Sequence, residues 1–181
     1  MAMLAQLWLP IVLSAVGVFV ASSLIHMLFK WHNRDYRKLP NEDAVRAAIN
    51  AGQPAPGLYV LPHALDAAEC KSEDMQKRFA EGPIGKLMLR APGAMSVGPM
   101  LLQWFLLNLV VAFVAACMAV GAMSAHHAAH TAGLATLLAY GAGAVSEAIW
   151  MGKPWAATLK DLLDALIYAV VTAAVFMWLW P

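Results

Sequence analysis

Long apolar stretches without charge alternate with short polar breaks along this chain. No Asp, Glu, Lys or Arg occurs from Met1 to Phe29, and none occurs in residues 91–146. A bilayer core of about 30 Å needs about 20 apolar residues per helix, so the second stretch is long enough for two helices. A further apolar run ends at Trp180. The pattern predicts an all-α integral membrane protein with four transmembrane helices, at residues 4–29, 98–123, 131–151 and 157–180.

Two short breaks separate the last three predicted helices. Residues 124–131, Ser-Ala-His-His-Ala-Ala-His-Thr, are the strongly polar interruption of the second stretch, and Gly121 and Gly133 flank them. Polar clusters between glycines are typical of loops, so we expect a loop there. The sequence Gly-Lys-Pro at residues 152–154 predicts a second, tighter turn.

Residues 30–96 form a polar insert between the first two helices. They hold ten of the twelve basic and eight of the eleven acidic residues. Cap residues predict short helices after Asn41 and Ser72, and the apolar runs 58–61 and 87–89 are expected to pair as a small hairpin. So few apolar residues can bury little core. We therefore divide the chain into a first membrane helix (1–29), the insert (30–96) and a three-helix unit (97–181), together one membrane domain.

The basic residues predict the orientation of the chain. Besides those in the insert, only Lys153 and Lys160 are basic, and they flank the turn between the third and fourth helices. Four helices place that turn and the insert on the same side, which the positive-inside rule makes cytoplasmic. We therefore expect a bacterial-type inner (plasma) membrane protein, multi-pass, with both termini outside and the insert in the cytoplasm.

Composition supports a membrane protein and excludes some functions. Hydrophobic residues make up 61% and charged residues 13% of the chain, against roughly 45–50% and 25% in ordinary globular proteins. A net charge of +1 argues against nucleic-acid binding. The chain lacks a Gly-x-Ser-x-Gly elbow, a His-Glu-x-x-His zinc helix and a phosphate-binding glycine loop. These observations favour a non-enzymatic protein without a cofactor.

Ionisable residues inside membrane helices are costly and are candidates for function. The candidates for an intramembrane polar or proton site, including two tyrosines on the same helix faces, are His26, Tyr140, Glu147, Asp161, Asp164 and Tyr168. If the last two helices form an antiparallel pair around Pro154, Tyr140 lies opposite Tyr168 and Glu147 lies opposite Asp161. This acidic seam fits a proton or cation path. It also fits ordinary helix packing with interfacial ion pairs, for example between Lys160 and Asp164 at i, i+4 spacing.

Three histidines gather in the break between the second and third helices. His126, His127 and His130 stand close together, and imidazole is a ligand for Zn, Cu and Ni. They are weak candidates for an open metal site, because no carboxylate or cysteine lies nearby in the sequence. A polar turn rich in alanine and histidine is the alternative.

The sequence leaves three classes of function open. Small residues recur every four positions in the predicted helices, which allows close helix contacts within one chain or between chains. The first expectation is a non-enzymatic accessory or self-assembling subunit of a membrane complex, with the bilayer and itself or another membrane protein as partners. The alternative is a small oligomeric proton or cation channel or transporter that uses the acidic seam. An enzyme or metal handler is the third class.

Overall fold

The computed structural model contains four helices that are long and apolar enough to cross a membrane. It describes residues 2–181; Met1, with which the first predicted segment begins, lies outside them. The spanning helices are α2 (Trp8–Ser23) with its π-helical continuation η1 (Leu24–Phe29), α6 (Val97–Ala119), α7 (Ala125–Met151) and α8 (Trp155–Leu179). A short helix, α1 (Ala2–Gln6), precedes α2. The predicted membrane-protein fold with four spanning helices is confirmed.

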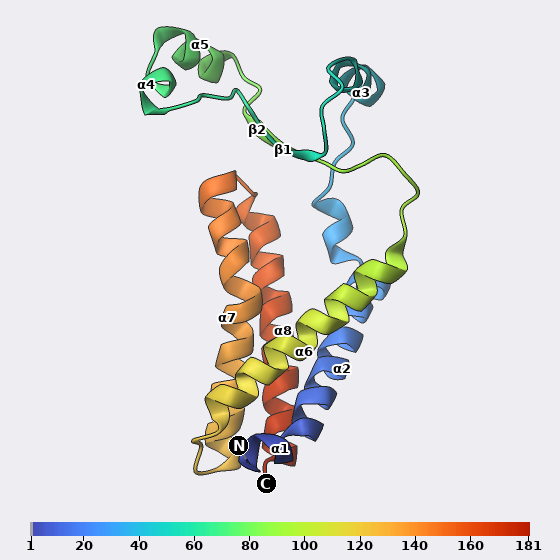
Figure 1. The fold of residues 1–181 in the computed structure, drawn as a ribbon, viewed down its shortest axis with the longest axis vertical. Coiled ribbons are helices and arrows are strands. Elements are labelled where there is room, and N and C mark those ends of the chain that lie inside the picture. Colours follow the sequence, from blue (N-terminus) through green and yellow to red (C-terminus); the bar gives the residue numbers. More distant parts are fainter. Residues whose placement is uncertain (1) are drawn as a thin grey trace. The chain divides into compact units, whose positions relative to one another are not determined.

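The chain divides into two compact units. Of the described residues, the membrane bundle comprises 2–36 and 96–181, and the insert comprises 37–95. Both chain ends lie at one end of the bundle, which we call the terminal end; the opposite end, where the chain leaves toward the insert, is the insert end (Figure 1).

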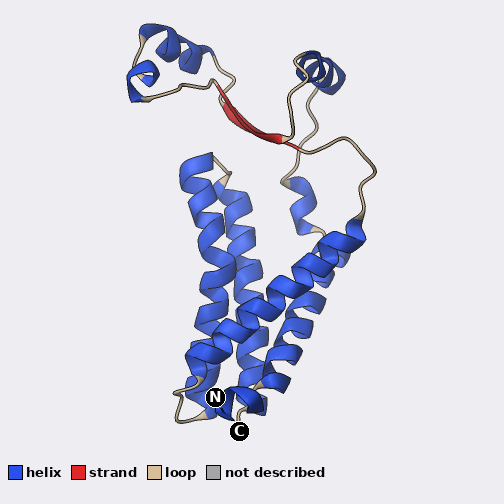
Figure 2. Ribbon diagram, in the orientation of Figure 1, coloured by secondary structure: helices blue, strands red, loops and turns tan. Residues whose placement is uncertain are grey.

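The insert contains the predicted helices and hairpin. Its elements are α3 (Glu42–Ala51), β1 (Gly57–Leu61), α4 (Ala67–Cys70), α5 (Glu73–Glu81) and β2 (Gly85–Leu89) (Figure 2). The strands are antiparallel, with Leu58 opposite Met88, so the predicted pairing is confirmed. Ser72 caps α5 by accepting a hydrogen bond from the Met75 backbone N–H at 3.3 Å. Met75 is the only buried side chain of residues 37–95, all of which are described, so the insert has almost no core.

Helices α7 and α8 form a closely packed antiparallel pair. A Cβ atom at Gly133 would lie 3.1 Å from the Ala173 Cβ, and one at Gly141 would lie 3.2 Å from Leu162 Cδ2. Glycine at these positions lets the two backbones approach, which is how membrane helices gain packing energy. The turn between the helices contains Gly152 in the left-handed conformation (φ 71°), as the Gly-Lys-Pro sequence predicts.

The loop predicted at residues 124–131 is wrong in its extent. Helix α7 already begins at Ala125, and Ser124 caps it by accepting a hydrogen bond from the His127 backbone N–H at 3.2 Å. The three histidines of this segment therefore lie on the first turns of a helix and are exposed. Here the polar composition reflects exposure at a helix end, whereas the irregular backbone is confined to residues 120–124.

Small apolar side chains close the terminal end of the bundle. We call this set the terminal apolar cluster: Leu7, Ala115, Ala116, Ala119, Ala128, Ala129, Ala132 and Phe176. It joins the start of α2 with the end of α6, the start of α7 and the end of α8. Its members are at most 3% exposed, so this end of the bundle has a continuous apolar core.

The glycine contacts on α7 predict unequal effects of one substitution. Gly133→Leu should destabilise the bundle, because overpacking of this kind costs typically 1–3 kcal/mol. The matched control is Gly143→Leu on the same helix, where a Cβ meets nothing within 4 Å. Thermal unfolding in detergent should show a lower Tm for Gly133→Leu alone. Equal Tm values for the two variants would contradict the close α7–α8 contact.

Candidate functional site

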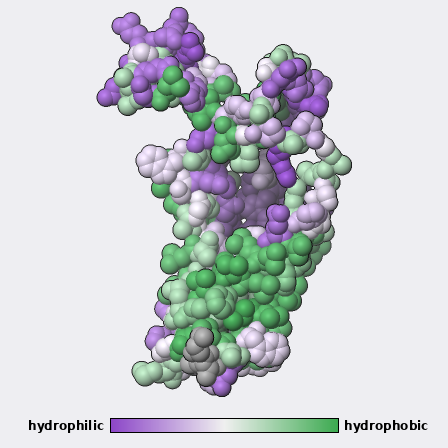
Figure 3. All heavy atoms as spheres, viewed as in Figure 1, coloured by the Kyte–Doolittle hydropathy of each residue, from purple (hydrophilic) through white to green (hydrophobic). Residues whose placement is uncertain are grey.

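A cavity of about 550 Å³ lies within the bundle, between α2, α6, α7 and α8. Its lining includes the aromatic side chains of Trp104, Tyr140 and Tyr168 and five charged or imidazole side chains: His26, Glu147, Lys153, Asp161 and Asp164. Figure 3 shows apolar residues covering the bundle toward the terminal end and hydrophilic residues nearer the insert end. The cavity therefore combines apolar walls with a charged base.

A reversal of the chain after α2 builds part of this base. The last turn of the helix widens into the π-helix η1, and Lys30 adopts a left-handed conformation (φ 54°). Residues Trp31–Arg34 then form a 3₁₀ turn, η2, directly after the reversal. This brings the His32 ring against the His26 ring, with 5.0 Å between centroids and 9° between planes. Such π-helical turns often occur at functional sites.

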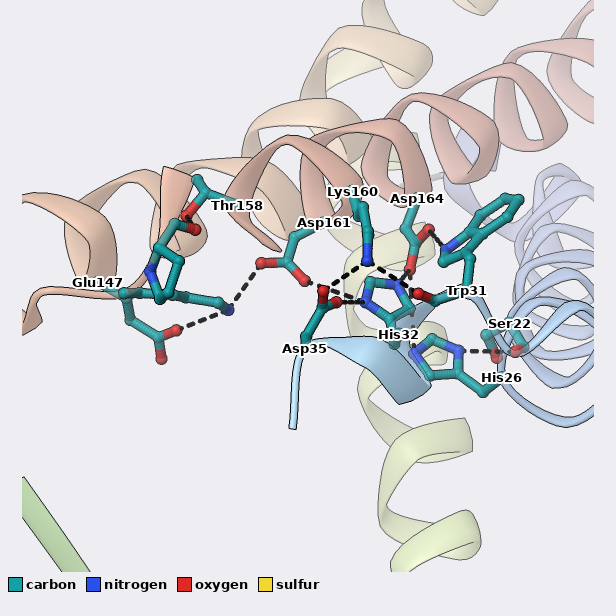
Figure 4. Close-up of polar contacts among 12 residues, drawn as sticks. Ser22, His26, Trp31, His32, Asp35, Glu147, Thr158, Lys160, Asp161 and Asp164 are labelled. Carbon is teal, nitrogen blue, oxygen red and sulfur yellow. Dashed lines mark hydrogen bonds and ion pairs between the residues drawn. The ribbon is translucent and has the colours of Figure 1, made fainter. Parts of the chain in front are cut away.

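The carboxylate of Asp164 is the centre of the polar contacts. Asp164 is 6% exposed on α8. Trp31 Nε1 donates a hydrogen bond to its Oδ1 at 3.1 Å, and His32 Nε2 lies 2.9 Å from its Oδ2. His26 Nε2 lies 3.9 Å from the same Oδ2 atom (Figure 4). Residues from two distant parts of the chain thus enclose one buried acidic group.

A second acidic residue holds the other side of the His32 ring. His32 Nδ1 lies 3.1 Å from Asp35 Oδ2. The Lys160 ammonium donates hydrogen bonds to Asp35 Oδ1 and to the Trp31 carbonyl oxygen. The hydrogen bond from Lys160 keeps the pKa of Asp35 below its usual 3.8. Lys160 therefore pairs with Asp35, on the segment that folds back after α2, and not with Asp164 at i, i+4 spacing on its own helix.

A second lysine bridges two of the predicted acidic residues. Lys153, in the turn between α7 and α8, lies 3.1 Å from Glu147 Oε2 and 2.7 Å from Asp161 Oδ2. Burial lowers the pKa of Lys153, but its hydrogen bonds to the two carboxylates outweigh burial, so the net pKa is above 10.5. Glu147 and Asp161 thus face each other across a shared cation.

The fixed charges of this cluster do not balance. Four carboxylates, Asp35, Glu147, Asp161 and Asp164, face two ammonium groups, Lys153 and Lys160. With all four carboxylates ionised and both imidazoles neutral, the cluster has a formal net charge of −2. A bound cation, or protons on the histidines or the carboxylates, would neutralise it.

The aromatic wall extends the polar contacts toward the terminal end. The rings of Tyr140 and Tyr168 lie 5.2 Å apart, as the antiparallel register predicts. Tyr140 donates a hydrogen bond to Asn108 Oδ1 at 2.6 Å, and Trp104 donates one to Ser22 Oγ at 2.8 Å. Beyond them lies the terminal apolar cluster.

The structure brings together the predicted residues of the acidic seam and adds further side chains to them. The additional side chains are Trp31, His32, Asp35, Asn108, Lys153 and Lys160. The spacing of His32 and Asp35, three residues apart just after an apolar helix, was the available signal for a paired side-chain contact. A second signal was Asn108, because it and Gln103 are the two amide side chains in the uncharged stretch of residues 91–146.

The histidines on α7 belong to no such cluster. His126, His127 and His130 are exposed. Among residues 2–181, the group of three or more potential ligands with closely spaced donor atoms is His26, His32 and Asp164. The histidine arrangement with the stronger geometry therefore lies at the insert end and not at the terminal end.

No family model matches this chain, and no curated protein or solved structure compared with it is similar.

The raised pKa of Lys153 predicts a pH-dependent contribution to stability. A raised pKa in the folded state stabilises the fold below pH 10.5, and this contribution is lost as pH rises through the higher folded-state pKa. Wild type should therefore have a higher Tm than Lys153→Met at neutral pH, and the difference should shrink above pH 10.5.

Lys77→Met is the control, because the Lys77 side chain is 73% exposed and lies 3.8 Å from Glu81. It should change Tm little at any pH. A Tm difference between wild type and Lys153→Met that is independent of pH would show that the ammonium charge does not stabilise the turn.

Proposed function

We propose that the protein is a small cation transporter of a bacterial-type inner membrane, which binds its cation at the charged base of the cavity. The observation behind this proposal is the formal net charge of −2 in the cluster, in which the side chains of Asp35, Asp161 and Asp164 are at most 26% exposed. Excess charge in an apolar environment is costly unless a counter-charge compensates it. A cation that enters the cavity from the insert end meets this uncompensated charge.

The closed terminal end supports a transporter in preference to an open channel. The polar side chains reach Asn108, and the terminal apolar cluster lies beyond them. A conducting channel needs a continuous hydrated route, whereas alternating access exposes a central site to one side at a time. A cavity that is separated from the terminal end by the terminal apolar cluster matches one state of such a cycle. The accessory or self-assembling subunit expected from the sequence remains a prediction.

The uncompensated charge predicts a specific loss of transport. In proteoliposomes that contain dyes for internal pH or for divalent cations, the wild type should move protons or cations down an imposed gradient. Asp164→Asn removes one of the negative charges and should reduce the flux to that of empty liposomes. Asp43→Asn is the control, because its carboxylate lies on the insert and is fully exposed. Equal flux through wild type and Asp164→Asn, or no flux through either, would contradict the proposal.

The proposed orientation can be tested with the native cysteine of the insert. In a Cys117→Ala background, a membrane-impermeant maleimide should label Cys70 only after the cells are opened, because the insert is expected in the cytoplasm. Met123, 95% exposed in the turn before α7, supplies the matched control. Met123→Cys in a chain without the native cysteines should react in intact cells. The reverse labelling pattern would show that the chain has the opposite orientation in the membrane.

A further inference from the structure

Three potential metal ligands converge at the edge of the cavity. One donor atom each of His26, His32 and Asp164 lies within 4.8 Å of the other two. The Asp164 Oδ2 atom is 2.9 Å from His32 Nε2 and 3.9 Å from His26 Nε2. Two ligand atoms of one tetrahedral Zn²⁺ ion lie about 3.4 Å apart, given Zn–N and Zn–O bonds of about 2.1 Å. The two observed distances lie on either side of this value, so small side-chain movements produce a ligand geometry.

The atoms that do not face the centre are held by other groups. His26 Nδ1 lies 2.9 Å from the Ser22 carbonyl oxygen, which only accepts, so Nδ1 carries the hydrogen and leaves Nε2 with a lone pair. His32 Nδ1 faces the Asp35 carboxylate at 3.1 Å in the same way. Metal-binding histidines almost always donate their second N–H to a carbonyl or carboxylate, which fixes the tautomer and the ring orientation.

The third ligand is oriented as well. Trp31 holds Asp164 Oδ1 at 3.1 Å, and this leaves Oδ2 directed toward the two imidazoles. In each of the three side chains, one atom is therefore free to bind a metal and the other contacts a neighbouring group of the protein. Figure 4 shows His26, His32 and Asp164 pointing toward one another, with Trp31 and Asp35 at their sides. A cluster of acidic residues alone does not have this arrangement.

Charge favours one divalent cation over two protons. Two imidazolium ions would also neutralise the net charge of −2, but the rings stack with only 5.0 Å between centroids. Two positive charges face to face at that distance repel each other. A single divalent cation supplies the same charge between the rings and the carboxylate, and it needs only neutral imidazoles.

The ligand types select the class of metal. Two imidazoles and one carboxylate suit Zn²⁺ and neighbouring divalent transition metals, whereas Mg²⁺ and Ca²⁺ prefer oxygen ligands alone. Both His26 and Asp164 also line the cavity, so a further coordination position faces open space. Three protein ligands with an open position are typical of sites where an exchangeable molecule also binds the metal.

We propose that His26, His32 and Asp164 bind one divalent transition-metal cation of the Zn²⁺ class, with Asp35 and Trp31 as positioning residues. This inference rests on the proposed cation site and names its cation. It places the metal at the insert end and not at His126, His127 and His130.

The test is metal titration of the whole protein, purified in detergent with a tag that contains no histidine and freed of metal with a chelator. Zn²⁺ should bind with one equivalent per chain. Co²⁺ should give the visible absorption of a tetrahedral or five-coordinate ion, which Zn²⁺ removes and excess Mg²⁺ does not. His32→Ala and Asp164→Asn should abolish the stoichiometric binding. Asp35→Asn should weaken it by about 10- to 100-fold, as changes to such second partners do.

The matched control replaces His126, His127 and His130 by alanine and should retain one equivalent. X-ray absorption of this Zn²⁺-loaded control variant, in which all proposed ligands are intact, should show two imidazoles and no sulfur. This measurement does not require the ligand variants to fold. Less than stoichiometric Zn²⁺ in wild type, unchanged binding in His32→Ala, or a spectrum without imidazole would each overturn the inference. Cation flux without metal binding would overturn only the inferred metal site. Metal binding without flux would overturn only the proposed transport function.

Discussion

The burial of the Asp164 carboxylate is the constraint on which the insert end of the bundle depends. An ionised carboxylate within a membrane helix costs several kcal/mol unless donors surround it. Its own helix supplies none, because the neighbouring Lys160 points to Asp35 and Trp31. Trp31, directly after α2, donates a hydrogen bond to Asp164 Oδ1, and both Trp31 and His32 reach this carboxylate only because the chain reverses at Lys30. The left-handed Lys30 costs about 1–2 kcal/mol, which the buried contacts offset.

The cavity follows from a difference between the two ends of α6. At the terminal end, alanines of α6 pack against alanines of α7 in the terminal apolar cluster. Toward the insert end, α6 contacts α2, through the Trp104 hydrogen bond to Ser22 and the edge-to-face rings of Phe19 and Phe105 at 5.7 Å. Figure 1 shows α6 crossing the bundle between these two contacts. Gly143 on α7, which lines the cavity, therefore faces open space. The space for a ligand arises where large aromatic side chains hold α6 against α2.

The fold was predictable from the sequence to a greater extent than the site. Hydrophobic length alone places four spanning helices, and the turn chemistry of residues 152–154 sets the α7–α8 register that brings Tyr140 to Tyr168. The start of α7 was missed because a capped helix end and a polar loop have the same composition. Asp164 and His26 could be identified because ionisable residues within apolar runs stand out. His32 lies outside the apolar runs, so its spacing from Asp35 was the available signal. Its contact with Asp164 on α8, 132 residues away in the sequence, could not be predicted from that spacing.

The cluster has one part in which lysines compensate the carboxylate charges and another part in which only imidazoles face the carboxylate. Lys153 lies between Glu147 and Asp161, and Lys160 binds Asp35, so the charges of both lysines are used within the network. Asp164 is the carboxylate whose ionisable partners are imidazoles only. A neutral imidazole has a lone pair that binds either a proton or a metal ion, whereas lysine ammonium groups keep their charge. The His26 side chain is 53% exposed and lines the cavity, so exchange at this part does not require the rest of the network to open. The structural ion pairs and the proposed cation site therefore share one network, joined at Asp35, which contacts both Lys160 and His32.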